Sequence, residues 1–242
     1  MNLFRLLVLV SVFAIGFQSR AQAEIKKLII KPSQIFIPVG FDNNDNSQVI
    51  MGGFYPNTCY KYSTPLVSID QNKNRVFITN RANYRTDEKC MDILVPYTAT
   101  VNIGALDAGK HDIFLEEEFG KFNQIDRNIT VKRALRSETD DHFYAPITQA
   151  FIDVSDLANP EIILSGLFTN TCMKLRDVRF ERMEDDILTV IPLATYSDLS
   201  CKDKKVPFQK RVKLPRNLYG DTLIHIRSLG GRSVNVIENF GE

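Results

Sequence analysis

The sequence predicts an all-β protein that consists of two tandem immunoglobulin-like antiparallel β-sandwich domains with one disulfide each. Three observations support this fold class. Residues 53–59 (GFYPNTC) return 113 positions later as residues 166–172 (GLFTNTC), and a second cysteine follows each copy, at Cys90 and at Cys201. Short β-branched or apolar runs bounded by Pro, Gly or Asn dominate both copies. No segment has a sustained helical period of apolar residues.

The N-terminus has the pattern of an export signal. Arg5 precedes an apolar run over residues 6–17, and residues 21–23 (AQA) have the small-x-small form of a signal peptidase site. The run of about a dozen residues is shorter than the roughly 20 that span a bilayer. We therefore predict a signal peptide over residues 1–23, a periplasmic or secreted location, and no transmembrane span in the mature chain.

The two copies share their order of expected strands. In the first copy, strands are expected at residues 25–30, 34–39, 48–51, 75–79, 98–103 and 110–115. In the second copy, residues 162–164 correspond to residues 49–51, residues 187–191 to residues 76–80, and Val212 and Leu214 to Val101 and Ile103. The matching features indicate a duplication of one β-rich module.

A charged stretch without a strand pattern separates the copies. It covers residues 132–141 (KRALRSETDD) and is predicted to be a linker between domain 1, at residues 24–131, and domain 2, at residues 142–242. Each domain then has about 100 residues, which suits a single β-sandwich.

The mature chain is close to electrically neutral. The full sequence has a formal net charge of +1, and removal of the signal takes away Arg5 and Arg20 but no acidic residue, which leaves −1. A nucleic-acid-binding protein would carry a basic surface. We therefore expect no nucleic-acid partner, and no residue pattern indicates a cofactor.

The cysteines are predicted to form one disulfide in each copy. An even number of cysteines in an exported chain favours disulfides, here Cys59 with Cys90 and Cys172 with Cys201. A four-cysteine zinc site is the weaker alternative, because no two cysteines have the C-x2–4-C spacing. The chain has no tryptophan, so the Cys…Trp…Cys core of antibody domains is absent. We expect each disulfide to tie a strand to a neighbouring loop.

The repeated residues resemble a pattern in uncharacterised exported bacterial proteins with small disulfide-containing immunoglobulin-like domains, G-x-x-P-x-x-C followed by C-x5-P-[FY]-x3-V. Copy one carries it as Gly53, Pro56, Cys59, Cys90, Pro96, Tyr97 and Val101. Copy two carries it as Gly166, Cys172, Cys201, Pro207, Phe208 and Val212, with Thr169 in place of the first proline. The resemblance implies an immunoglobulin-like fold and a cell-envelope location, and it implies no catalytic residues.

The sequence does not predict an enzyme. None of His111, His142 and His225 lies in a catalytic motif. His225 is expected on the solvated face of a strand. A hydrolase in which His111 or His142 lies beside a carboxylate remains an alternative.

Two polar segments have a structural and a functional interpretation. Residues 42–46 (DNNDN) resemble the start of a calcium loop, but Ser47 and Gly53 replace the glycine and the glutamate that such a loop needs. An Asx-rich turn without metal is favoured. The repeated Asn-Thr-Cys is either a duplicated binding loop or, as we favour, a turn whose side chains satisfy backbone groups.

The strongest charge feature is a basic segment in copy two. It consists of Lys202, Lys204, Lys205, Lys210, Arg211, Lys213 and Arg216. The segment is either a binding surface for an acidic protein, lipid headgroups or an anionic polymer, or the solvated face of an edge strand that avoids edge-to-edge pairing.

Together these features predict an exported, non-enzymatic binding or structural protein of the bacterial cell envelope. Its partner would be another envelope or extracellular protein or an anionic polymer, and two copies would allow bivalent engagement. An inhibitor of an exported hydrolase and an unrecognised hydrolase are the alternatives. The oligomeric state stays open.

Overall fold

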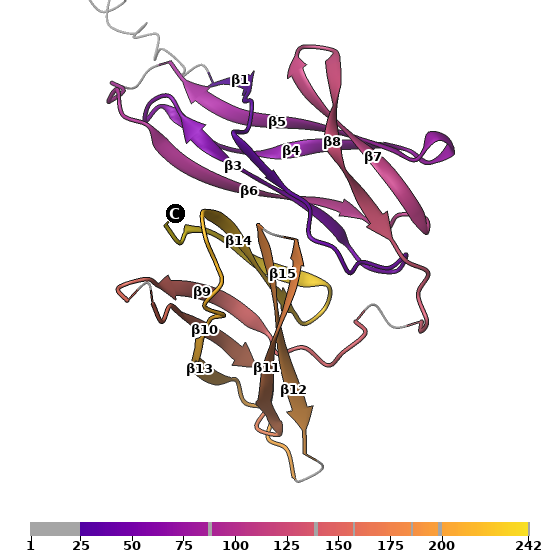
Figure 1. Cartoon of the computed structure of the whole chain (residues 1–242), viewed down its shortest axis with the longest axis vertical. Coiled ribbons are helices and arrows are strands. Elements are labelled where there is room, and N and C mark those ends of the chain that lie inside the picture. Colours follow the sequence, from indigo (N-terminus) through magenta and orange to yellow (C-terminus); the bar gives the residue numbers. More distant parts are fainter. Residues whose placement is uncertain are drawn as a thin grey trace, which may run out of the picture.

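The computed structural model describes residues 25–86, 89–137, 140–156, 158–184, 186–197 and 200–241, without the side chains of residues 182–184. The predicted signal peptide lies outside the described residues. The fold consists of two tandem immunoglobulin-like β-sandwich domains (Figure 1). Domain 1 contains β1 (Ile25–Ile29), β2 (Gln34–Phe36), β3 (Ser47–Tyr55), β4 (Tyr60–Asp70), β5 (Arg75–Arg85), β6 (Val95–Gly104), β7 (Gly109–Glu118) and β8 (Lys121–Val131), with a 3-10 turn at Gln71–Lys73.

Domain 2 repeats this arrangement. Its strands are β9 (Ile147–Asp153), β10 (Glu161–Phe168), β11 (Met173–Glu184), β12 (Ile187–Tyr196), β13 (Val206–Lys213), β14 (Asp221–Ser228) and β15 (Arg232–Asn239). A three-stranded sheet, β2-β3-β6 or β9-β10-β13, faces a larger sheet that contains β4-β5-β7-β8 or β11-β12-β14-β15. Strand pairs are antiparallel except for β5 with β7 and β12 with β14, which run parallel.

Alternation along the strands builds each core. Successive residues of a strand point to opposite faces of the sheet. Val49 and Met51 of β3 therefore enter the core of domain 1, and Ile162 and Leu164 of β10 enter the core of domain 2.

The two parallel strand pairs show that the predicted alignment of the two copies is wrong by one residue at β12. Val76 lies opposite Ile113 in domain 1, and Leu188 lies opposite Ile224 in domain 2. Leu188 is therefore the equivalent of Val76, and the predicted match of Ile187 to Val76 is wrong. A shift of one residue moves a side chain to the other face of the sheet. Ile187 accordingly leaves the core of its own domain.

The repeated glycine and the repeated Pro-aromatic pair meet across two strands. Gly53 lies opposite Tyr97, and Gly166 lies opposite Phe208. A Cβ atom built on Gly166 would lie 2.6 Å from the Phe208 ring and 2.2 Å from the carbonyl oxygen of Pro146. The glycine is needed because the aromatic ring covers its backbone.

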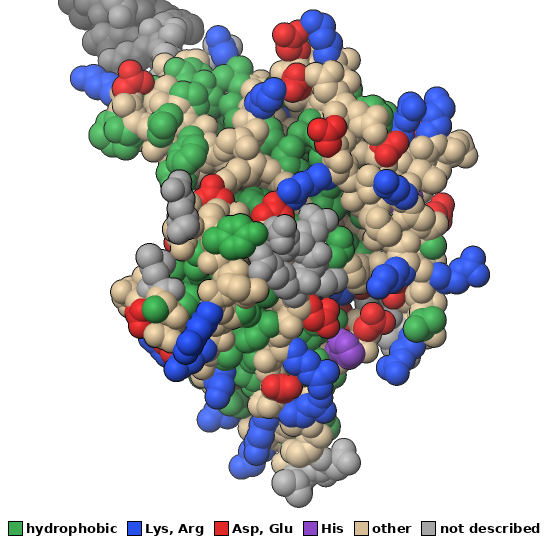
Figure 2. Space-filling view, viewed as in Figure 1, with side chains coloured by type: hydrophobic (Ala, Val, Ile, Leu, Met, Phe, Trp, Pro, Cys, Tyr) green, Lys and Arg blue, Asp and Glu red, His purple; other side chains and the backbone are tan. Residues whose placement is uncertain are grey.

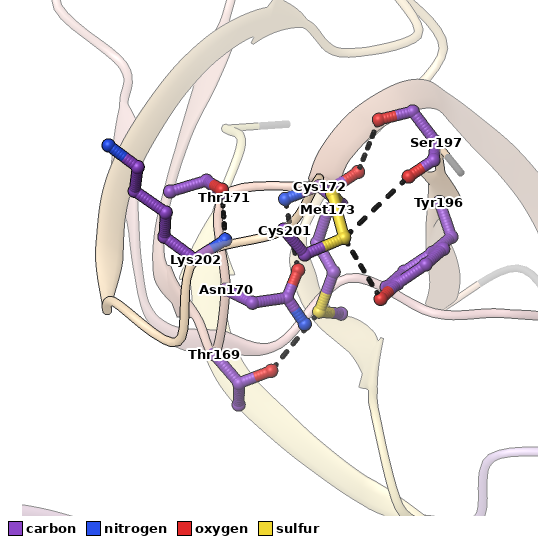
Figure 3. The surroundings of a disulfide bond; sticks show 9 residues. All are labelled: Thr169, Asn170, Thr171, Cys172, Met173, Tyr196, Ser197, Cys201 and Lys202. Atoms are coloured by element: carbon purple, nitrogen blue, oxygen red, sulfur yellow. Dashed lines mark hydrogen bonds between the residues drawn. A yellow bond between two sulfur atoms is a disulfide. The ribbon is translucent and has the colours of Figure 1, made fainter. Parts of the chain in front are cut away.

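Both predicted disulfides are confirmed, Cys59–Cys90 and Cys172–Cys201. Each joins the turn before β4 or β11 to the connection before β6 or β13. The expected tie between a strand and a loop is therefore wrong in one respect, because none of the four cysteines lies in a strand. The Asn-Thr-Cys turn also has the favoured structural role (Figure 3). Asn170 Oδ1 accepts from the backbone N–H of Cys172 at 3.0 Å, and Thr171 Oγ1 accepts from that of Lys202 at 3.0 Å.

The first copy has the same turn. Asn57 Oδ1 accepts from the N–H of Cys59, and Thr58 Oγ1 accepts from the N–H of Met91. The repeated residues thus fix the connection next to each disulfide.

The three-stranded sheet of domain 1 packs against the larger sheet of domain 2. Figure 1 shows β3 and β6 of domain 1 beside β14 and β15 of domain 2, and the outer faces of the two sheets meet there. An apolar cluster forms the centre of the contact, with Phe36 and Ile50 from domain 1 and Ile187, Leu223 and Ile237 from domain 2. This contact explains why β3 is buried on both faces.

A buried ion pair also joins the two domains. Arg227 donates to Asp45 at 3.1 Å, and the side chains are only 11% and 3% exposed. The guanidinium also lies over the rings of Phe41, at 5.3 Å, and Tyr144, at 5.5 Å. Burial raises the pKa of Asp45, although Arg227 acts in the opposite direction.

The Asx segment at residues 42–46 connects the domains. Asp45 holds Arg227, and Asn44 Nδ2 donates to the carbonyl of Arg136 in the predicted linker. At the other end of the predicted linker, Asp140 accepts from the backbone N–H groups of Gly230 and Gly231. The connection between the domains is therefore fixed by contacts on both sides.

Only the larger sheet of domain 2 presents this apolar outer surface; the larger sheet of domain 1 does not. The residues of domain 1 that occupy the places of Ile187 and Leu223 are Arg75 and Asp112. Because charged side chains stand there, the larger sheet of domain 1 does not repeat the apolar surface that domain 2 presents.

His225 lies in the domain contact, and the prediction that it is solvated is wrong. Its side chain is on the outer face of β14, but domain 1 covers that face and leaves the residue 1% exposed. Nδ1 lies 2.7 Å from Asn235 Oδ1, and the ring meets Phe41 edge-on. Burial lowers the pKa of His225 from 6.5 to about 4, against the opposing effect of the Asn235 hydrogen bond.

We expect acid to weaken the folded state through His225. Between pH 6.5 and 4 the unfolded chain binds the proton and the folded chain does not, so this contribution is complete above pH 6.5 and is lost as the pH falls toward 4. The full effect is about 3 kcal/mol. Urea unfolding of wild type and His225→Gln over this pH range measures it. An unchanged pH dependence in the variant contradicts the assignment.

Candidate functional site

An apolar cleft runs along the open side of domain 2, between the edge strands β11 and β13. Its volume is about 490 Å³, within the range of about 300–1,000 Å³ that is usual for ligand sites. It is lined by Phe168, Met173, Lys174, Leu175, Arg176, Asp177, Val178, Val206, Phe208, Gln209, Lys210 and Val212.

The floor of the cleft is the margin of the hydrophobic core. Phe208 stacks on Phe168 with 4.3 Å between the ring centroids. Leu175 and Val178 of β11 are partly buried and pack against the same core. Because these side chains are only partly buried, they remain accessible from the edge of the sandwich.

The rim of the cleft is basic. Lys174 and Arg176 come from β11 and Lys210 comes from β13, and all three are exposed. Asp177 is the one carboxylate among the described residues of the lining. It accepts from Arg179 at 3.3 Å and from the backbone N–H of Val178 at 2.9 Å. Figure 2 shows Lys and Arg side chains gathered over the lower part of domain 2, with hydrophobic surface between them.

The structure distributes the predicted basic segment over different surfaces. Only Lys210 lines the cleft. Arg211 points to the opposite face of the sheet and pairs with Asp153 at 2.9 Å and Glu161 at 2.7 Å. Hydrogen bonds from Ser155 and then Arg211 hold the pKa of Asp153 at about 2. Lys213 borders the same opposite surface.

The remaining members are exposed outside the strands. They are Lys202, Lys204 and Lys205 in the connection before β13, and Arg216 in the turn after it. The side chain of Lys202 points away from the disulfide in Figure 3.

Sequence reasoning missed Lys174 and Arg176. A signal was present, because basic and apolar residues alternate from Met173 to Arg176, as on the edge of a half-buried strand.

The matching side of domain 1 is built differently. There β4 lies beside β6, with Cα atoms within 8 Å of one another. Tyr55 stacks on Tyr60 and on Tyr97, and the Tyr97 hydroxyl accepts from Asn80 at 3.0 Å. Ala99, which is 1% exposed, occupies the position of Lys210.

The three histidines lie apart from the cleft. His111 is fully buried, with Nε2 2.7 Å from the carbonyl oxygen of Asp107. His142 is exposed and meets Tyr144 edge-on. Among the residues that the structure describes, no group of three or more His, Cys, Asp or Glu side chains could hold a metal ion.

Residues 49–124 match the family model described as the ORF11 beta-sandwich domain. The match covers most of β3, all of β4 to β7 and the start of β8, and it agrees with the sandwich of domain 1. Comparison with curated proteins and with solved structures finds no match. The part of the chain that the structure describes holds no helix long and apolar enough to cross a membrane.

Proposed function

We propose that the protein is an exported, non-enzymatic binding protein of the bacterial cell envelope, and that it holds its partner in the cleft of domain 2. The cleft carries this proposal. It combines accessible core side chains with three exposed basic groups, and its equivalent in domain 1 is occupied by stacked tyrosines. Apolar surface surrounded by polar groups is typical of binding sites.

The composition of the cleft supports binding rather than catalysis. The lining residues that the structure describes include no serine, threonine, cysteine or histidine that could act as nucleophile or base. All four cysteines are engaged in disulfides.

Export is supported by the N-terminal signal pattern and by the disulfides, which persist in oxidising compartments. The fixed contact between the domains and the difference between the two copies favour one site per chain over bivalent engagement.

Affinity capture from periplasmic and secreted fractions tests the proposal. The bait is the chain from residue 24, as wild type, Lys210→Glu or Lys213→Glu. Lys213 lies on the same strand but borders the opposite surface, so it is the matched control. We expect at least one component to bind wild type and Lys213→Glu equally and to be lost with Lys210→Glu. If no component distinguishes Lys210→Glu from wild type, the proposal is wrong.

A further inference from the structure

The cleft of domain 2 has an unpaired strand along one side. β13 pairs with β10, and within the described residues no strand pairs with its second edge. The free N–H and C=O groups of an edge strand can accept an additional strand. β11 forms the other side but has a register shift between Leu175 and Asp177, whereas all eight residues of β13 pair with β10 without a shift. β13 is therefore the more regular template.

The side chains of β13 suit an alternating partner. Val206, Phe208, Lys210 and Val212 share the face that lines the cleft. A strand added beside them would place every second side chain over the cleft floor. Pro207 has no N–H to donate, so the main-chain pairing would use the residues after it.

The charges indicate the sign of the partner. Lys174, Arg176 and Lys210 surround the cleft, and Lys202, Lys204 and Lys205 precede β13. An acidic side chain on the cleft-facing side of the added strand, beside Lys210, would meet these groups. Side chains on its other face would point toward the surface of Arg211 and Lys213. The lysines of the cleft and those before β13 oppose pairing of β13 with β13 of a second copy, because like charges would be brought together.

Copy one supports a role for Lys210 that the fold itself does not require. The same inward position holds the buried Ala99, which packs in the core of domain 1. In domain 2 the lysine at this position places a charge at the cleft, where domain 1 has a small apolar side chain.

We propose that the cleft binds an extended acidic segment of a partner protein, which adds as a strand to the free edge of β13 and turns an acidic side chain toward Lys210 and apolar side chains toward the rest of the cleft floor. This inference rests on the proposed function and specifies its partner class. A segment of about eight residues would match the length of β13.

Binding of defined peptides tests this mode by fluorescence anisotropy. The probe is a capped nine-residue peptide, Thr-Val-Thr-Glu-Thr-Val-Thr-Val-Thr, in which every second side chain faces the cleft and an antiparallel pairing puts the glutamate beside Lys210. Two control peptides carry lysine in place of glutamate, or N-methyl groups that remove backbone donors on one edge. We expect the acidic peptide to bind at least about tenfold more tightly than either control.

The variants assign the binding to the cleft. Lys210→Glu and Lys174→Glu should each weaken the acidic peptide about tenfold, and Lys213→Glu should change its affinity less than about twofold. Equal binding of all three peptides, or an unaffected Lys210→Glu, overturns the inference. The inference is also overturned if wild type binds no peptide and Lys210→Ala self-associates. In that case the lysine serves only to prevent edge-to-edge pairing of β13.

The two tests separate the two levels of the proposal. Capture that depends on Lys210, together with failure of the acidic peptide, overturns strand addition and leaves the binding function. Failure of both overturns both.

Discussion

Replacement of Arg227 by methionine is expected to lower the free energy of unfolding by about 3–5 kcal/mol. Arg227 and Asp45 come from different domains and are almost completely buried. The attraction between two buried charges offsets the cost of removing them from water, so loss of one partner leaves the other without compensation. In the variant, the Asp45 carboxylate would be buried without its counter-charge.

Urea unfolding monitored by circular dichroism measures this loss. The matched control is Glu118→Ala, which breaks the exposed pair of Glu118 with Lys121 and should change stability by less than about 1 kcal/mol. In the double variant Arg227→Met, Asp45→Leu, much of the stability should return because no unpaired charge remains. A loss below about 1 kcal/mol in Arg227→Met would show that the ion pair does not hold the domains together.

Removal of the Cys172–Cys201 disulfide by a double alanine substitution is expected to cost about 3–4 kcal/mol, because the unfolded chain regains the freedom of a loop of about 30 residues. The same substitution at Cys59 and Cys90 should cost a similar amount, since the separations are 29 and 31 residues.

Unfolding of the two double variants in urea, compared with wild type under non-reducing conditions, gives both values. Thr171→Val provides a local control, because it keeps the disulfide but removes the hydroxyl that accepts from Lys202, at a cost of about 1 kcal/mol. A disulfide variant that is no less stable than Thr171→Val would contradict the expected contribution.

Local patterns predicted the two sandwiches, the disulfides and the Asn-Thr-Cys turn. These features depend on neighbours in sequence. Strand alternation, the even cysteine count and the tendency of Asn and Thr to bond to the backbone are visible without knowledge of the tertiary structure.

The contact between the domains could not be predicted in this way. Alternation correctly places His225 on the outer face of its strand, but only the tertiary structure shows that domain 1 covers this face. The register of the repeat also differs by one residue at β12, which moves Ile187 from the expected core position to the domain contact.

The candidate site was predicted in part. The basic segment contains Lys210, but charge alone did not separate it from Arg211, which has carboxylate partners on the opposite face. A signal was available, because alternate residues of a strand share one face. These are Val206, Phe208, Lys210 and Val212. The cleft between β11 and β13 has no equivalent pattern in the sequence.

Hydrogen–deuterium exchange along β13 tests the central claim most directly. The mature protein is compared with and without the acidic peptide at a concentration that saturates the anisotropy signal. We predict slower exchange in residues 206–213, because an added strand engages the free edge, and unchanged exchange in β7 of domain 1. Unchanged exchange in residues 206–213 would contradict strand addition in the cleft.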